Sequence, residues 1–375
     1  MAPEGANLLT AVEQVAAFGL PGREPRPVAL LSDDDSWTAF RDSIVRQRLT
    51  GFAVAAMEAG LLQPKDHQAQ ELVDRQREAM VQAVELERRL IGVFEALEAA
   101  GLEPVVLKGP ALAHQVYPDP AWRAFGDIDL LVATHEWRRA CSVLRDLGYR
   151  RKLPEPRRGF DERFGKAAMH VGSDGSEIDL HRTLVIGPFG LWIDPEEMLS
   201  RATTFTLAGR RLRRLADTDL FLHSCVHASL GWTPPLLLPL RDVAQISWNV
   251  EVDWDLAGRM ASVWKLVPVI HHAVENLQRE LEVGLPDGAL RLAAAKQGRL
   301  ERRALRAYCG ERRRRGETAL LTLLAIPGLR RKAAYVLDLV VPAREFLEAR
   351  TPQGERPSYR RRWAVPLRRL RRTHR

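Results

Sequence analysis

Apolar residues spaced three or four positions apart dominate the first hundred residues, and this spacing predicts helices. Residues Ser32–Asp35 offer N-caps and first-turn acids before Trp37, which predicts one helix from there to about Gly60. A second apolar stripe runs from Gln68 to Ala100 without an internal proline. It predicts one long helix, or two nearly collinear ones, that stop at Gly101.

Short apolar runs separated by turn residues follow this helical region. Residues 104–107 and 128–132 have the composition of buried strands. Helical spacing returns briefly at residues 112–117 and 134–147. Residues 167–180 contain two short runs around the sequence SDGS, which is typical of a β-hairpin. Strand, helix, strand, helix and hairpin predict an α+β core with a mixed sheet, and not a long doubly wound sheet.

The rest of the chain returns to helical spacing. Helices are predicted at residues 217–231, 241–250, 256–281 and 299–315, followed by a packed helical hairpin over 319–341. On this pattern the chain divides into an N-terminal helical region at 1–100, an α/β core at 101–215, a C-terminal helical domain at 216–330 and a basic segment at 331–375.

Composition places the chain among ordinary globular proteins. Its 375 residues are 46% apolar and 28% charged, which excludes disorder and a small disulfide scaffold. Cys141, Cys225 and Cys309 form no CxxC pair, so a zinc ribbon is excluded and a reducing compartment is expected. No apolar run reaches the roughly 18 residues of a membrane span, and the first residues lack a signal-peptide pattern. We therefore expect a cytoplasmic protein without a membrane span.

The net charge of +8 is concentrated at one end of the chain. Residues 301–375 hold 21 Lys or Arg and 7 Asp or Glu, so residues 1–300 are mildly acidic. Arginine clusters occur at 312–315, 360–362 and 368–372. They have the charge to bind RNA, an anionic lipid surface or an acidic partner, and a solvated tail is the alternative. Nucleic-acid binding is not favoured, because the nearby aromatic residues lack the periodic spacing of a base-stacking surface.

The sharpest chemical feature is the sequence GDIDLLV at residues 126–132. Side chains two apart on a strand point the same way, so Asp127 and Asp129 share one face while Ile128 and Leu130 enter the core. Two neighbouring carboxylates repel each other unless a cation lies between them, and oxygen ligands suit Mg²⁺ or Mn²⁺. The pair predicts a divalent-metal site. The motif alone leaves open that it is only a solvated acidic pair.

Two flanking segments extend this picture. Lys108–Gly109 lies in a strand-turn-helix position, where a cation and backbone amides meet phosphates. Glu177, Asp179 and His181 alternate along the second hairpin strand and so share a face. Three acids on two neighbouring strands suit a two-metal phosphoryl or nucleotidyl transfer, in which one ion activates the attacking oxygen and the other holds the triphosphate.

Several motifs occur together in a fixed order. They are Leu107-Lys-Gly109, Tyr117-Pro-Asp-Pro120, Arg123, Asp127-Ile-Asp-Leu-Leu-Val132, Ile178-Asp-Leu-His181, Cys225-Val-His-Ala228 with Gly231-Trp232, and Arg241-Asp242. In combination they resemble the uncharacterised bacterial nucleotidyltransferase family within the DNA polymerase β superfamily. The helix around Trp37 and the segment Val341–Phe346 resemble the two ends of that family, so the resemblance covers most of the chain.

The resemblance implies a minimal polymerase-β-like nucleotidyltransferase sheet flanked by N-terminal and C-terminal helical regions. It implies that Asp127, Asp129 and Asp179 hold Mg²⁺ or Mn²⁺, and that Asp179 is the candidate base for an acceptor hydroxyl. The nucleotide-binding residues that follow from it are Lys108, Gly109, Arg123, His181, His227 and Asp242.

The chain departs from the wider superfamily at one position. Many members carry Gly-Ser after the first strand, where this chain has Lys108–Gly109. Lys108 therefore either neutralises phosphate charge or pairs with Asp127 or Asp129. Arg123 has the same two interpretations, since it either clamps a phosphate with its two-pronged guanidinium or holds the carboxylates in place.

His223 and His227 are four residues apart and share one helical face, a spacing that permits a metal site. No further ligand has a suitable spacing, and such a pair more commonly packs and hydrogen-bonds. The resemblance favours His227, with Asp242, as part of the wall of the active-site cleft. There is no GxSxG sequence, and the apolar neighbours of Cys225 predict an inert thiol.

These observations favour an Mg²⁺-dependent nucleotidyltransferase that moves a nucleoside monophosphate from an NTP to a hydroxyl or phosphate acceptor. Its partners are the NTP, with ATP, GTP, CTP and UTP not distinguished, and a small-molecule, peptide or macromolecular acceptor. Two alternatives remain: a non-catalytic nucleotide-binding or partner-binding accessory protein with the same fold, and an RNA-binding protein that uses the arginine-rich end.

Overall fold

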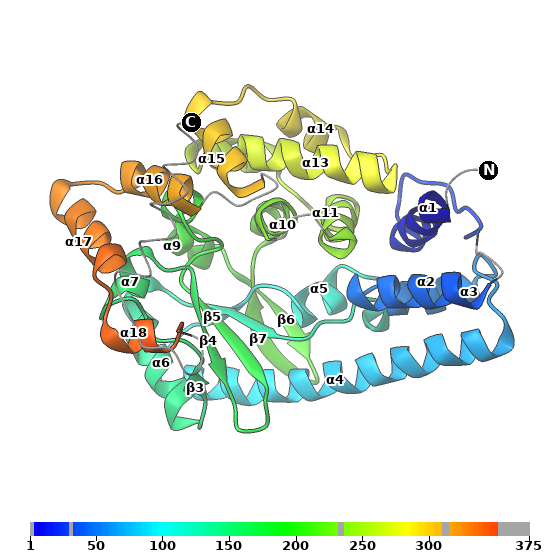
Figure 1. The fold of residues 1–375 in the computed structure, drawn as a ribbon, viewed down its shortest axis with the longest axis horizontal. Coiled ribbons are helices and arrows are strands. Elements are labelled where there is room, and N and C mark those ends of the chain that lie inside the picture. Colours follow the sequence, from blue (N-terminus) through cyan, green and yellow to red (C-terminus); the bar gives the residue numbers. More distant parts are fainter. Residues whose placement is uncertain (1–3, 30–32, 232–235, 310–314, 352–375) are drawn as a thin grey trace.

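The computed structural model describes residues 4–29, 33–231, 236–309 and 315–351 (Figure 1). Its strands are β1 (Val105–Val106), β2 (Ile128–Leu131), β3 (Arg150–Arg151), β4 (Ala167–Val171), β5 (Glu177–His181), β6 (Thr203–Leu207) and β7 (Arg210–Arg214). The helices before β5 are α1 (Glu4–Ala17), α2 (Asp34–Arg46), α3 (Thr50–Glu58), α4 (Asp66–Ala99), α5 (Pro110–Gln115), α6 (Trp137–Asp146) and α7 (Phe160–Phe164), with 3₁₀ turns η1 (Pro120–Trp122) and η2 (Thr134–Glu136). The helices after β5 are α8 (Pro188–Trp192), α9 (Pro195–Ser200), α10 (Asp217–Leu230), α11 (Leu237–Asn249), α12 (Trp254–Val263), α13 (Val267–Leu281), α14 (Asp287–Ala293), α15 (Arg299–Cys309), α16 (Arg315–Ala325), α17 (Leu329–Val340) and α18 (Arg344–Glu348).

The seven strands form one mixed sheet in the order β3-β4-β5-β2-β1-β7-β6. Strand β2 pairs with β5 and β1 pairs with β7 in parallel, and the other neighbouring strands are antiparallel. This arrangement confirms the predicted α+β class and its mixed sheet. It also sets β2 and β5, the two strands that carry the acidic motifs, side by side near the middle of the sheet.

Helices cover the sheet on both sides. The C-terminal half of α4 packs with α6 on one side, in a core that includes Leu90, Phe94, Trp137, Ile128 and Leu180. Figure 1 shows α4 running below the sheet and extending beyond it toward α2 and α3. Helix α4 is continuous from Asp66 to Ala99, so the first of the two predicted alternatives, one long helix, is confirmed. Its buried positions recur at helical spacing.

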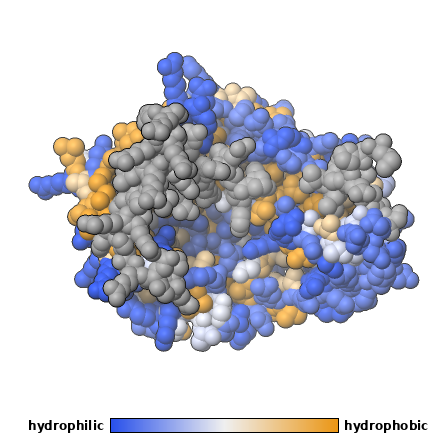
Figure 2. Space-filling model, viewed as in Figure 1, coloured by the Kyte–Doolittle hydropathy of each residue, from blue (hydrophilic) through white to orange (hydrophobic). Residues whose placement is uncertain are grey.

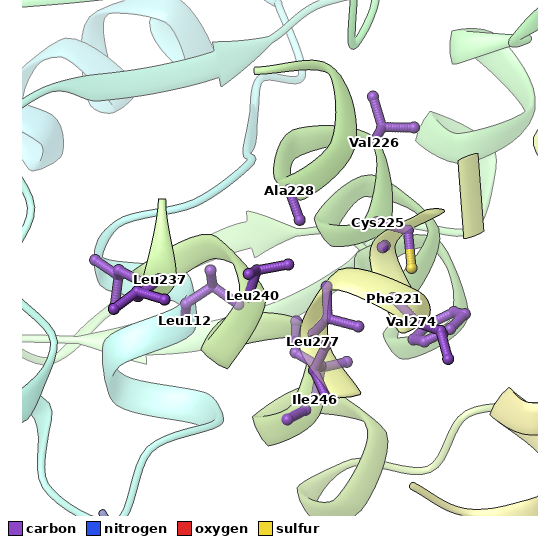
Figure 3. Close-up of a cluster of buried hydrophobic side chains, with 14 of the residues drawn as sticks. Leu112, Phe221, Cys225, Val226, Ala228, Leu237, Leu240, Ile246, Val274 and Leu277 are labelled. Carbon is purple, nitrogen blue, oxygen red and sulfur yellow. The ribbon is translucent and has the colours of Figure 1, made fainter. Parts of the chain in front are cut away.

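A second and larger core joins the N-terminal helices to the helices that follow the sheet. It includes side chains from α1, α2 and α3 together with α10, α11 and α13. Figure 3 shows part of it, where Leu112 of α5 lies near Leu237 and Leu240 of α11, and Ile246 lies beside Leu277 of α13. Segments more than 200 residues apart in the sequence thus share one apolar interior.

Two predicted helices are each split in the structure. The predicted helix up to Gly60 is wrong as a single element, because Arg48 adopts a left-handed conformation with φ of 58° between α2 and α3. The predicted helix over 256–281 is likewise two helices, because Lys265 has φ of 58° between α12 and α13. Left-handed residues interrupt a helix, and neither position carries the glycine that normally signals such a break.

The β6–β7 hairpin was missed by the sequence patterns. Its turn residues Ala208 and Gly209 both have positive φ, which is the geometry of the two-residue turns favoured in hairpins. Phe205 and Leu212 face the core, while threonines and arginines occupy the outward positions. The arginine-rich sequence RRLRR hides the alternation of this strand.

No helix within the described residues is long and apolar enough to cross a membrane. The arginine clusters at 360–362 and 368–372, most of the cluster at 312–315, and Trp232 lie outside the part of the chain that the structure describes.

Candidate active site

Three carboxylates converge where β2 and β5 lie side by side. Asp129 and Asp179 are direct partners in the parallel β2–β5 register, so their side chains leave the same face of the sheet. Asp127 comes just before β2, two residues from Asp129, and shares that face. The intervening Ile128 and the following Leu130 are fully buried on the opposite side, which fixes this orientation. The predicted trio of acids is therefore assembled by strand pairing.

Exposure differs sharply among the three acids. The side chain of Asp129 is 3% exposed, that of Asp179 19% and that of Asp127 38%. Asp129 thus forms the floor of the site and Asp127 its outer edge.

Both oxygens of Asp129 already have partners within the protein. Its Oδ2 lies 2.9 Å from the Lys108 ammonium, and its Oδ1 lies 2.9 Å from Nε2 of His181. The same His181 nitrogen is 3.1 Å from Oδ2 of Asp179, so His181 bridges the two acids. Lys108 therefore pairs with an acid in this structure, which is one of the two interpretations that the sequence left open.

The pKa values at the floor of the site follow from these contacts. Burial raises the pKa of Asp129, but the Lys108 ammonium and His181 outweigh it and hold that pKa well below its usual range. Burial lowers the pKa of Lys108, but Asp129 and Asp127 more than compensate and raise it. The two groups therefore stabilise each other as an ion pair.

Asp127 behaves in the opposite way. Burial, and then the negative charge of Asp129, raise the pKa of Asp127 above its usual range, although Lys108 and Arg48 act against them. For Asp179, burial raises the pKa, but His181 and Lys166 lower it to a net value below the usual range. A cation added beside Asp127 would relieve the repulsion that Asp129 exerts on it.

Two basic residues at the rim were not found by sequence reasoning. Nη1 of Arg48 lies 3.9 Å from Oδ1 of Asp127, and Nζ of Lys166 lies 3.8 Å from Oδ2 of Asp179. Both distances exceed a hydrogen bond, and both side chains are at least one-third exposed. Lys166 directly precedes β4, so its place beside the hairpin was a usable signal. For Arg48 no local signal exists, because it comes from the turn between α2 and α3.

Gly109 forms the turn that follows β1 and begins α5. Its φ of 57° and ψ of −118° favour glycine, and Pro110 then occupies the first helical position. This agrees with the predicted strand-turn-helix arrangement and leaves Lys108 beside the acids.

Arg123 and Asp242 bind each other instead of facing the three acids. Nε and Nη2 of Arg123 donate to the two oxygens of Asp242, each at 2.8 Å, and the hydroxyl of Tyr117 donates to Asp242 at 2.7 Å. The charged pair is almost fully buried. The guanidinium therefore uses its two-pronged face within the protein, and this pair joins the segment before β2 to α11.

His223 and His227 lie on α10 with ring centroids 6.3 Å apart. Burial, and then the positive charge of Lys108, hold the pKa of each well below the usual range, so both are neutral. Nδ1 of His223 is buried without a hydrogen-bond partner among the described atoms. Neither belongs to a group of three or more metal-ligand side chains in the described part of the chain.

The donor set fits a hard divalent cation. Among the described residues, one group of potential ligands gathers within 4.8 Å, and it consists of Asp129, Asp179 and His181. Asp127 lies outside this group, and its carboxylate meets Arg48 only at 3.9 Å, so it is available to Mg²⁺ or Mn²⁺. Asp179 would share its oxygens between the cation and His181. Asp129 would have to exchange its contact with Lys108 or His181.

A family model described as an uncharacterised nucleotidyltransferase matches residues 33–282. No curated protein matches the sequence. Among solved structures, an antigenic nucleotidyltransferase-like protein from Paracoccidioides brasiliensis has a TM-score of 0.32 and 13% identity, over 54% of this chain and 94% of that one.

Proposed function

Because this chain belongs to the family described as uncharacterised nucleotidyltransferases, we propose that it moves a nucleoside monophosphate from an NTP to a hydroxyl or phosphate acceptor. The proposal includes Mg²⁺ or Mn²⁺ dependence and the polymerase-β-like character that the motifs suggest. The observation that carries it is the convergence of Asp127, Asp129 and Asp179 at the paired strands β2 and β5.

Asp127, Asp129 and Asp179 would hold the cation. When bound, the ion would screen the charge of the triphosphate and make the acceptor hydroxyl more acidic. The parallel register of β2 and β5 keeps two of the carboxylates at a fixed spacing, so the site does not have to be ordered on binding.

Basic residues around the acids would receive the phosphates. Arg48 and Lys166 stand at opposite acids, Asp127 and Asp179, and their loose contacts leave N–H donors free for phosphate oxygens. Lys108 would balance the charge of Asp129, as it does in this structure, until the cation takes its place. Two exposed cations at the rim and one buried cation at the floor thus divide the electrostatic work.

The transfer step needs one base and one leaving group. The acceptor oxygen attacks the α-phosphorus, the bond from that phosphorus to the bridging oxygen breaks, and pyrophosphate leaves with the bond electrons. Asp179 would take the acceptor proton as an ionised carboxylate that is more exposed than Asp129. His181, which bridges Asp179 and Asp129, would hold that carboxylate in position.

Calorimetric titration with Mg·NTP tests the metal assignment. The double variant Asp127→Asn/Asp129→Asn should lose binding, while Asp146→Asn, an exposed acid at the end of α6, should bind like the native chain. Equal binding by the native chain and the double variant would show that the acids do not hold the metal.

Label transfer tests catalysis separately. The native chain should transfer label from α-labelled NTP to a component of a cell extract and release pyrophosphate, and Asp179→Ala should abolish both. Native chain that binds Mg·NTP but transfers label to no fraction would favour a nucleotide-binding accessory protein. That alternative is supported by one observation, the occupation of both Asp129 oxygens by Lys108 and His181.

A further inference from the structure

Helix α17 carries an apolar surface on its outward side. Its exposed apolar residues are Leu329, Ala333, Val336, Leu337 and Val340. Leu329 is 84% exposed, and Val336, Leu337 and Val340 are each at least 42% exposed. At 100° per residue these five positions fall within about one-third of the helix circumference. Figure 2 shows apolar side chains gathered at the edge of the molecule where α17 lies in Figure 1.

The inward side of the same helix packs into a small apolar cluster and also carries one ion pair. Tyr335 packs against Phe160 and Phe164 of α7, and Asp338 makes a 3.0 Å ion pair with Arg163. These contacts fix the rotation of α17 about its axis. The helix is therefore apolar on two sides, because Tyr335 and Leu339 pack inward while the stripe from Leu329 to Val340 faces out. Isolated exposed apolar side chains are common, but five on one helix face are not.

Basic residues border this apolar stripe on both sides. Arg330 and Lys332 lie on opposite flanks of it by helical spacing. Arg344, at the start of α18, is already paired with Glu348. An apolar face between two basic flanks is the pattern of helices that lie in the plane of a membrane interface, where long basic side chains reach the headgroups. An acidic residue on these flanks would have opposed such a contact.

We propose that the outward face of α17 docks on an anionic lipid surface, with Leu329, Val336, Leu337 and Val340 entering the interface and Arg330 and Lys332 contacting the headgroups. The occupant is chosen by charge complementarity, since the two charged residues of α17 that flank the stripe, Arg330 and Lys332, are both basic. Docking would be peripheral and reversible, as a twelve-residue helix with a few apolar side chains is a weak anchor. It would hold the protein at a membrane independently of the chemistry at β2 and β5.

Vesicle co-sedimentation of the full chain tests this surface. The native chain should sediment with vesicles of phosphatidylcholine and phosphatidylglycerol, less with phosphatidylcholine alone, and less at high salt. Leu329→Ser/Leu337→Ser should lower the partition coefficient by about tenfold or more, because each serine removes apolar area from the interface. Arg330→Gln/Lys332→Gln should lower it by roughly fivefold per charge on the anionic vesicles alone.

Val263→Ser is the matched control, because Val263 is an apolar side chain that is 70% exposed on α12, a helix that packs against α10 and α14. It should bind vesicles like the native chain, and circular dichroism melts should show all variants folded. Sedimentation velocity tests whether a second copy of the chain covers this face instead of a lipid surface. If the native chain is a dimer and Leu329→Ser/Leu337→Ser is a monomer, the face is a dimer interface. Native-like vesicle binding by that variant would overturn the proposal and assign binding to other basic segments.

Discussion

The buried pair between Arg123 and Asp242 provides the sharpest test of how the structure differs from the sequence-based interpretation. Both residues were assigned to nucleotide binding from the motifs, whereas in the structure they bind each other. The perturbation is Asp242→Asn, which keeps the shape of the side chain and removes its charge. The amide oxygen of the new asparagine can still accept from the Tyr117 hydroxyl. Its amide nitrogen, however, faces Nη2 of Arg123, so two hydrogen-bond donors oppose each other.

The expected cost follows from burial and geometry. The side chains of Arg123 and Asp242 are 5% and 3% exposed, and three hydrogen bonds of 2.7–2.8 Å meet at the carboxylate. Removing one partner of such a pair leaves an uncompensated buried charge, which costs about 3–5 kcal/mol. For comparison, Glu348→Gln breaks the exposed pair with Arg344 and should cost at most about 1 kcal/mol.

Urea unfolding followed by circular dichroism measures both variants against the native chain. The triple variant Tyr117→Phe/Arg123→Met/Asp242→Leu removes the Arg123 guanidinium together with its partner and leaves Arg241 as the buried charge beside them. It should recover part of the stability lost in Asp242→Asn, because the Arg123 guanidinium is no longer left unpaired, while Arg241 still loses the attraction of Asp242. The phenylalanine is included because the Tyr117 hydroxyl would otherwise lose its acceptor.

Two results would refute this reasoning. If Asp242→Asn had the same urea midpoint of unfolding as the native chain, the pair would contribute nothing to the stability of the fold. A triple variant that is stable but no longer binds Mg·NTP would return Arg123 and Asp242 to the nucleotide site, as the motif resemblance implied.

Three further predictions concern the site itself. Burial holds the pKa of His223 well below 6.5, so the contribution of His223 to stability is present above pH 6.5 and is lost as the pH falls below it. In His223→Leu, the free energy of unfolding in urea should therefore fall less steeply with decreasing pH than in the native chain. An equally steep fall in both proteins would contradict this. Lys108→Met should bind Mn²⁺ about tenfold or more tightly in the absence of nucleotide, because the variant removes the ammonium that pairs with Asp129 at 2.9 Å and repels a cation. Weaker binding in a calorimetric titration would exclude competition between lysine and metal. Arg48→Ala and Lys166→Ala should each weaken Mg·NTP binding by about tenfold or more, which is the value of one hydrogen bond to a charged group. Lys152 pairs with Glu177 and not with the three acids, so Lys152→Ala should bind Mg·NTP like the native chain.

Local pattern determined much of the framework from the sequence alone. The alternation in residues 126–132 places Asp127 and Asp129 on one face, and the same alternation through 177–181 does so for Asp179 and His181. Helix α4 and the β4–β5 hairpin follow from unbroken helical spacing and from a turn sequence. Such features depend on neighbours a few residues away, so a single sequence contains the information for them.

Pairings between distant segments were decided only by the tertiary structure. Arg123 and Asp242 are 119 residues apart, and their spacing says nothing about which charge each one meets. Arg48 reaches Asp127 because α2 and α3 meet at this left-handed residue. The outward orientation of the stripe on α17 follows from the inward contacts of Tyr335 and from the ion pair between Asp338 and Arg163. A side chain's charge and polarity are properties of the residue, but its partner and its burial depend on how helices pack on the sheet. The sequence therefore determines which chemical groups are available at the site, and packing decides which of them stay free to bind a ligand.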